Sequence, residues 1–142
     1  MSTAAVGTGA VVRERDWMVW AGWLLSALAA SIFLWSAYMK LTRQAGYVTE
    51  MERLGYSPHV LTALALLQSS CLALYLFPRT STLGAVLLTG YLGGAIASYV
   101  RIGDALFANT FQTSVALLLW GGLYLRENRL WSLLPVRTGP IR

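Results

Sequence analysis

The chain has 142 residues, of which 56% are hydrophobic and 12% are charged, whereas charged residues make up roughly a quarter of soluble domains. This composition excludes an ordinary soluble enzyme and predicts one membrane domain. The net charge of +5 does not indicate nucleic-acid binding, because the arginines are scattered over expected loops and helix ends instead of forming one basic face with interleaved aromatic rings.

The first apolar segment, 17–39, contains no charged residue and is long enough to cross a bilayer core about 30 Å thick. Three tryptophans at its start, and Tyr38 and Lys40 at its end, are typical anchors at the membrane interface. Residues 1–16 are expected to form a flexible N-terminal tail. A signal peptide is not indicated, because the apolar run is too long and no small-residue cleavage site follows it.

The connection after this segment, 40–58, carries an apolar stripe beside Glu50, Glu52 and Arg53. Such a pattern predicts a short helix that lies on the membrane surface. Two interpretations are open: a solvated amphipathic connector, or a lid over a cavity between the spans.

Three further apolar segments follow, at 59–77, 83–100 and 106–125. The first of these ends at Pro78, which cannot continue a helix, and at Arg79, which marks the water boundary. The four segments together predict an all-α polytopic membrane protein, a four-transmembrane-helix bundle over residues 17–134. A C-terminal tail, 135–142, follows.

The distribution of lysine and arginine predicts that both termini lie in the cytoplasm. Seven of these residues fall on the side of the termini and the short turn, and four fall on the opposite side. An excess of positive charge marks the cytoplasmic side of a membrane protein. The chain is therefore expected to be a multi-pass protein of the inner (cytoplasmic) membrane.

Metal and haem chemistry is not predicted, because the chain has a single histidine, His59, and a single cysteine, Cys71. No ionisable side chain is expected at mid-membrane depth, which argues against a proton relay and against general acid–base catalysis in the bundle. No catalytic residue is assigned, and a stand-alone enzyme is not the favoured interpretation.

Polar side chains within the spans are the candidates for binding. Gln68 is the most informative, because its amide has two N–H donors and two oxygen lone pairs to satisfy. It either bonds a neighbouring helix or contacts a bound headgroup or ring. Arg101 and Asp104, three residues apart, form either an exposed ion pair or, through the arginine, a contact with an acidic headgroup. The candidate ligand-binding residues are Gln68, Tyr91, Ser98, Tyr99, Arg101 and Trp120.

The third span carries a ridge of small residues, since Gly90, Gly94 and Ser98 recur at every fourth position. Such a ridge predicts close packing against another helix. Tyr91 and Tyr99 share a different edge of the same helix, where they are either packed rings or the sides of a cleft.

Four stretches of the sequence resemble the DoxX-like family of small membrane proteins. They are "FLWSAYMKLT", "LGYSP", "LFPRTSTLGAVLLTGYLGGAIASYVRIGD" and "LLLWGGLYLRENRLWSLLP". The resemblance covers nearly all of the chain after the N-terminal tail, and its proline-arginine turn followed by "LGAVLLTGYLGGA" is the most specific part. The sequence departs from the family pattern in two places: Gln68 stands where many relatives carry glutamate, and Ser98 and Tyr99 stand where threonine and histidine are common. Both departures remove an ionisable group.

The resemblance implies a four-helix membrane bundle. The wider family takes its name from a subunit of an archaeal terminal quinol oxidase and thiosulfate:quinone oxidoreductase. Together with the absence of ionisable groups in the spans and the small-residue ridge, this resemblance favours a non-catalytic subunit or partner of a membrane oxidoreductase. The alternatives are a quinone- or lipid-binding membrane protein and, less favoured, a small transporter or a membrane enzyme that acts on an apolar substrate. Quinone is the candidate cofactor, and the expected partners are the lipid bilayer, oxidoreductase subunits and a second copy of the chain.

Overall fold

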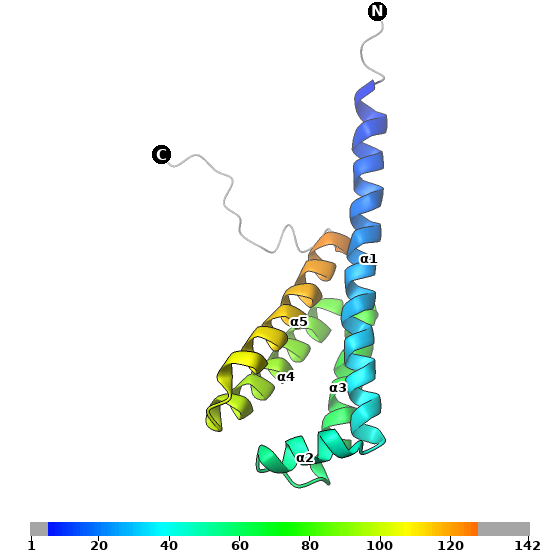
Figure 1. The fold of residues 1–142 in the computed structure, drawn as a ribbon. Coiled ribbons are helices and arrows are strands. Elements are labelled where there is room, and N and C mark those ends of the chain that lie inside the picture. Colours follow the sequence, from blue (N-terminus) through cyan, green and yellow to red (C-terminus); the bar gives the residue numbers. More distant parts are fainter. Residues whose placement is uncertain (1–5, 128–142) are drawn as a thin grey trace, which may run out of the picture.

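The computed structural model is helical, without strands in the part of the chain that it describes. That part is the backbone of residues 6–127 and the side chains of residues 17–127, except those of residues 105, 107 and 108. Its helices are α1 (Val6–Leu41), α2 (Ala45–Arg53), α3 (Val60–Leu76), α4 (Ser81–Arg101) and α5 (Ala105–Arg126), as Figure 1 shows.

Helix α1 is longer than the sequence predicts. It begins at Val6 instead of near Trp17, so the larger part of the expected flexible tail is helical. No proline interrupts residues 6–16, and a helix that has formed extends at little cost into such a segment. With 36 residues, α1 is about 54 Å long at 1.5 Å per residue, and Figure 1 shows that it extends beyond the ends of the helices beside it.

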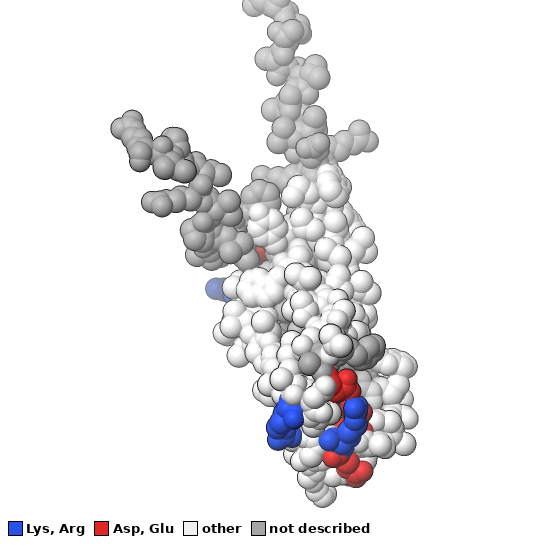
Figure 2. Space-filling model, turned by 60° about the vertical axis from the view of Figure 1, so that its left-hand side comes forward, with Lys and Arg blue, Asp and Glu red and all other residues white. Residues whose placement is uncertain are grey.

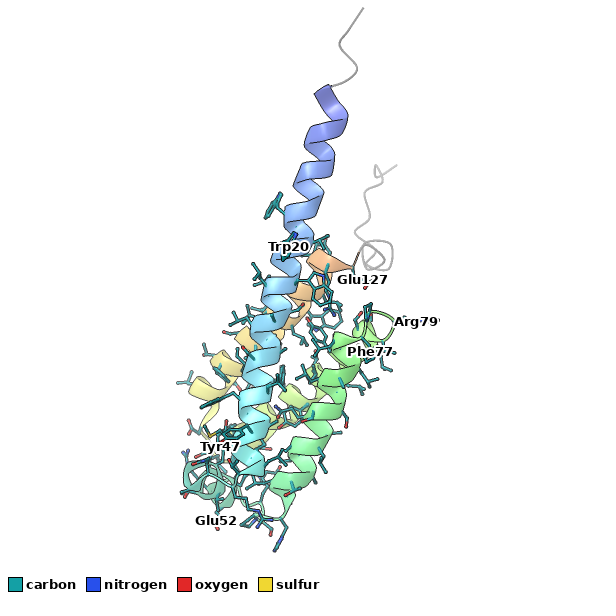
Figure 3. All side chains as sticks on the ribbon, turned by 90° about the vertical axis from the view of Figure 1, so that its right-hand side faces the viewer. Trp20, Tyr47, Glu52, Phe77, Arg79 and Glu127 are labelled. Carbon is teal, nitrogen blue, oxygen red and sulfur yellow. The ribbon has the colours of Figure 1, made fainter. Side chains whose placement is uncertain are left out.

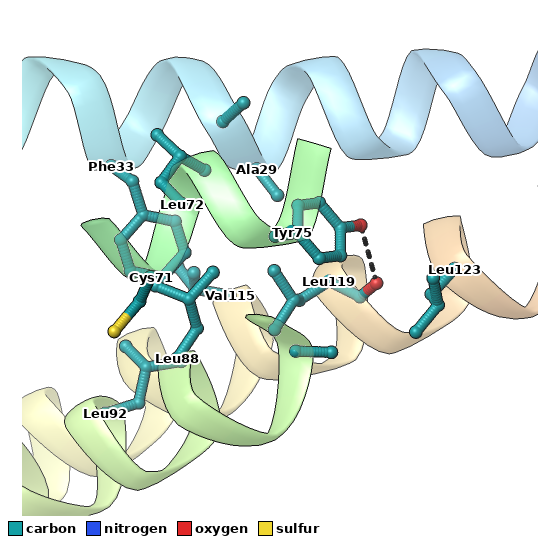
Figure 4. Close-up of a cluster of buried hydrophobic side chains, with 12 residues drawn as sticks. Ala29, Phe33, Cys71, Leu72, Tyr75, Leu88, Leu92, Val115, Leu119 and Leu123 are labelled. Carbon is teal, nitrogen blue, oxygen red and sulfur yellow. Dashed lines mark hydrogen bonds between the residues drawn. The ribbon is translucent and has the colours of Figure 1, made fainter. Parts of the chain in front are cut away.

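The four longer helices form a ring, because α1 and α4 each pack against both α3 and α5. Helix α2 lies across one end of this ring (Figure 1). The buried core inside the ring consists of Ala29, Ala30, Phe33, Cys71, Leu72, Tyr75, Ala85, Leu88, Leu92, Val115, Leu119 and Leu123. The polar end of Tyr75 is satisfied within this core: its hydroxyl donates to the Leu119 carbonyl at 2.9 Å (Figure 4) and lies 2.9 Å from the Ser26 hydroxyl.

The closest helix contacts lie at glycines other than those of the predicted ridge. A Cβ atom at Gly84 would run into the backbone of Tyr75, and one at Gly122 would lie 2.8 Å from the Ser26 backbone nitrogen. At Gly90 and Gly94, an added Cβ would meet nothing within 4 Å. The expected close packing at this ridge is therefore not made by any described helix of this chain. Helix α4 instead buries the face that carries Gly84, so the ridge points outward.

The surface of the ring is apolar. Two helical segments, Trp17–Leu41 and Ser81–Arg101, are long and apolar enough to cross a membrane by length and composition, and α3 is a shorter apolar helix of 17 residues. Many large apolar side chains on these helices are exposed, among them Leu24, Leu28, Leu34, Leu66, Leu67, Leu83 and Val86. Figure 2 shows that charged side chains gather at the lower end, below a broad surface of uncharged residues. Exposed apolar surface of this extent indicates an interaction with lipid or protein.

Candidate functional site

The residue that organises the candidate site is Lys40, the last inward-facing residue of α1. Buried residues of α1 follow one face of the helix, at Ser26, Ala29, Ala30, Phe33, Ala37 and Lys40. Side chains of a helix tilt toward its N-terminus, so a lysine near the C-terminal end of α1 extends back into the bundle. Lys40 is therefore only 5% exposed, although the sequence predicts an anchor at the membrane interface. The regular spacing after Phe33 and Ala37 is the sequence signal that identifies it.

Hydrogen bonds fix the Lys40 ammonium between α1 and α3. Its Nζ donates to Ser36 Oγ at 2.6 Å and to Gln68 Oε1 at 2.7 Å. Gln68 is itself 1% exposed, and its Nε2 donates to the Phe33 carbonyl at 2.6 Å. Because the backbone acceptor orients the amide nitrogen, the amide oxygen of Gln68 is directed at Lys40. Gln68 thus makes interhelical hydrogen bonds, the first of the two interpretations of its amide.

Two tyrosine rings complete the surroundings of Lys40. Nζ lies 5.7 Å from the ring centroid of Tyr47 on α2 and 5.5 Å from that of Tyr91 on α4. The face of an aromatic ring carries partial negative charge and attracts a cation at this distance. The site therefore draws on four helices, and it assembles only when the ring and α2 are folded together.

The Lys40 ammonium lacks an anionic partner among the described residues. The ion pairs of this part of the chain join Arg53 to Glu50 at 3.4 Å and to Asp104 at 2.8 Å, and none includes Lys40. An ammonium has three N–H donors, and here two of them have an oxygen acceptor among the described side chains. The third N–H has no oxygen acceptor among the described residues, so its strongest partner would be an oxygen with negative charge or a strong carbonyl dipole.

Two other predicted residues, Ser98 and Arg101, contact the segment that follows α2 instead of the lysine site. The Ser98 hydroxyl lies 2.9 Å from the Tyr56 hydroxyl, and Arg101 Nη2 donates to the Leu54 carbonyl. The Arg101 guanidinium also lies 5.7 Å from the centre of the Tyr56 ring. These contacts hold the α2 segment against the end of α4.

The predicted ion pair between Arg101 and Asp104 is not formed. Gly103 adopts a φ of +79°, which ends α4 and takes Asp104 off the helical path that would place it beside Arg101. Asp104 instead pairs with Arg53 of α2, and this hydrogen bond raises the pKa of Arg53 above its usual value. Asp104 therefore ties the connection between α4 and α5 to α2.

The remaining candidates lie elsewhere. Tyr99 interacts with the Glu50 carboxylate of α2, and Trp120 Nε1 donates to Thr89 Oγ1 at 2.9 Å, between α5 and α4. The six predicted residues thus form separate groups, and the group with Gln68 and Tyr91 is the one that contains the buried lysine. Among the described residues, no cluster of histidine, cysteine, aspartate or glutamate has the composition to hold a metal ion.

A comparison with known protein families covers the residues around Lys40. The profile of the DoxX-like family matches residues 24–122, which include all the residues around Lys40. The chain belongs to the DoxX-like family. No curated protein and no solved structure matches it. Family membership and the two apolar helices together indicate that this DoxX-like protein is a membrane protein. The buried lysine lies within the matched region of the DoxX-like chain, whereas the first residues of α1 lie outside it.

Proposed function

We propose that this DoxX-like protein is a four-span protein of the inner membrane that binds the polar headgroup of a quinone or a lipid, as a non-catalytic component of a membrane oxidoreductase system. Both termini face the cytoplasm in this proposal. The observation that carries it is the buried Lys40 ammonium, whose described partners are all uncharged.

Charge and shape both support a headgroup with an oxygen acceptor. A buried cation is costly unless it has partners, and its described hydrogen-bond acceptors are the neutral oxygens of Ser36 and Gln68. A quinone carbonyl or a lipid phosphate supplies the missing acceptor. The rings of Tyr47 and Tyr91 near the ammonium offer flat apolar surfaces to a planar headgroup. The apolar tail of either molecule would lie against the exposed leucines on the outside of the ring of helices.

The test is to purify the full-length protein in a mild detergent, extract it with organic solvent and measure quinone and phospholipid in the extract. We expect one of the two in a fixed ratio to the protein. In the Lys40→Met variant we expect the retained amount to fall about tenfold, which corresponds to the loss of one charge-assisted hydrogen bond. Arg43→Gln is the matched control, because Arg43 is exposed three residues away and its loss removes the same charge.

The identity of the extracted molecule separates the two ligand classes. Retained quinone, lost in Lys40→Met and kept in Arg43→Gln, supports the oxidoreductase assignment. Retained phospholipid with the same dependence supports a lipid-binding protein instead. An extract without either molecule, or retention that Lys40→Met leaves unchanged, contradicts the proposal.

A partner subunit is a second candidate function, and the outward ridge of α4 favours it. The ridge at Gly90 and Gly94 has no close neighbour among the described helices, and small residues in lipid let a helix approach closely. We expect a stable partner to co-purify under several mild detergents, in amounts that Gly94→Leu reduces. A protein that runs alone after crosslinking in native membranes contradicts this role.

A further inference from the structure

Arg126 lies at the end of the bundle opposite to the lysine site and continues the inward face of α5, in which Leu119 and Leu123 are buried. Its guanidinium carbon lies 4.7 Å from the ring centroid of Trp23 on α1 and 4.8 Å from that of Tyr75 on α3. The guanidinium is thus framed by two aromatic rings from different helices. An arginine in such a frame keeps its planar donors in a fixed orientation.

One terminal nitrogen of the Arg126 guanidinium has a hydrogen-bond acceptor among the described residues, and the other has none. Nη2 donates to the Tyr75 carbonyl at 2.7 Å, one of the last carbonyls of α3, which have no partner within the helix. Nη1 is enclosed and has no hydrogen-bond acceptor among the described residues. No described carboxylate lies within 4 Å of it either. An enclosed N–H without an acceptor is rare in a folded protein and indicates a missing ion, water or ligand.

The surroundings of Arg126 indicate the source of the missing acceptor. Trp20 on α1 is 72% exposed at this end of the bundle, and Trp23 is 44% exposed. Figure 3 places Trp20, Phe77, Arg79 and Glu127 together at this end, whereas Tyr47 and Glu52 lie at the other. Exposed tryptophan rings beside cationic side chains are typical of the depth at which phospholipid headgroups lie.

We infer that Arg126, framed by Trp23 and Tyr75, binds a phosphate oxygen of an anionic phospholipid. The guanidinium fork supplies N–H donors that match the oxygens of a phosphate. Inorganic phosphate offers the same oxygens, so the test must separate the two sources. This site is independent of the function proposed for Lys40, because the two lie at opposite ends of the bundle.

The test places the full chain in nanodiscs of phosphatidylcholine alone, of an equal mixture of phosphatidylcholine and phosphatidylglycerol, and of phosphatidylcholine with inorganic phosphate in the buffer. We measure the unfolding temperature in each and the phosphatidylglycerol retained in native mass spectrometry. The wild-type protein should unfold at a higher temperature with phosphatidylglycerol. Arg126→Gln should abolish this difference and retain about tenfold less phosphatidylglycerol.

Three further variants sharpen the result. Arg126→Lys keeps the charge but loses the planar fork. It should therefore show most of the loss of phosphatidylglycerol binding expected for Arg126→Gln. Arg79→Gln, an exposed arginine at the same end, should behave as the wild type. Trp23→Leu leaves the bond between Arg126 and the Tyr75 carbonyl in place and should still weaken the response, which keeps the test valid if Arg126→Gln does not fold.

Two outcomes overturn the inference. A phosphatidylglycerol response that neither Arg126→Gln nor Trp23→Leu changes rules out this site. Stabilisation by inorganic phosphate that equals that of phosphatidylglycerol assigns the oxyanion to free phosphate and rules out the lipid.

Discussion

Lys40 and Arg126 occupy equivalent places in two helices. Each is the last inward residue near the C-terminal end of its helix, and each has a long side chain that extends back toward the N-terminus. At the N-terminal end of a helix the same tilt would direct a cation outward, toward water. Position within the helix, and not only distance from the apolar run, decides whether a terminal cation is buried.

The Gln68 amide contributes to stability through both of its polar atoms. Replacing it in Gln68→Leu leaves Lys40 Nζ and the Phe33 carbonyl each without one partner. We expect the free energy of unfolding to fall by about 1–2 kcal/mol, since interhelical hydrogen bonds in membranes are individually modest. The measurement is reversible unfolding of the purified protein in a fixed detergent mixture.

Gln44→Leu is the control for this substitution, because Gln44 is exposed and its side chain does not cap α2. It should change the free energy of unfolding by less than about 0.5 kcal/mol. Equal effects of the two substitutions would mean that the buried hydrogen bonds of Gln68 add nothing to stability.

The side-chain chemistry of Gln68 predicts a residue that needs partners, and the structure supplies them. The same reasoning does not find Lys40, because the sequence places it just after an apolar run, where an exposed anchor is the usual outcome. Its burial follows from the spacing of Phe33 and Ala37 before it. The partners of Arg101 could not be predicted either, since they depend on where the α2 segment lies across the bundle.

At the scale of elements, the packing of α3 on α4 depends on Gly84. An added methyl group there meets the backbone of Tyr75, which cannot move without separating the two helices. We expect Gly84→Ala to lower the free energy of unfolding by about 1–3 kcal/mol. The measurement is unfolding in the same detergent mixture, with helix content followed by circular dichroism.

Gly90→Ala is the matched control on the same helix, because an added Cβ there meets nothing within 4 Å. Alanine is the better helix former by up to about 1 kcal/mol, so this variant should be neutral or slightly stabilising. A loss at Gly90 as large as that at Gly84 would show that the ridge does pack against something in the purified protein.

The α2 segment contacts the bundle at two places, which bears on the two interpretations of the 40–58 connection. Arg53 and Leu54 are bound to residues at the end of α4, and Tyr47 lies over the lysine site. The connector therefore packs against the bundle at Lys40 and near the end of α4. Periodicity predicts the helix itself, but not what lies beneath it, because amphipathic stripes on a surface helix do not specify their neighbour.

At the scale of the molecule, orientation in the membrane is open to a direct test. We expect both termini in the cytoplasm, because more lysine and arginine residues lie on their side. Alkaline phosphatase fused after Arg142 should therefore be inactive, and green fluorescent protein at the same place should be fluorescent. The control is a chain that ends after Arg43 and carries the same phosphatase, which should be active. The reverse pattern would overturn the orientation.

The helical fold class was predictable from the length of the apolar segments, and the family was predictable from the quoted motifs. The sequence did not predict how far α1 extends or that Gly90 and Gly94 face outward. A small-residue ridge predicts that a helix can approach, and it does not say whether that helix belongs to the same chain.

The first and last helices of the ring are direct neighbours, and α1 at Gly22 lies against the end of α5, where an added Cβ would be 2.8 Å from the Arg126 backbone nitrogen. The turn between α3 and α4 lies at this same end (Figure 3). The packing of the helices therefore does not require their present order along the chain. A circular permutant that joins α5 to α1 and opens at Pro78 would keep every helix beside its present neighbours and both new ends on the same side of the membrane.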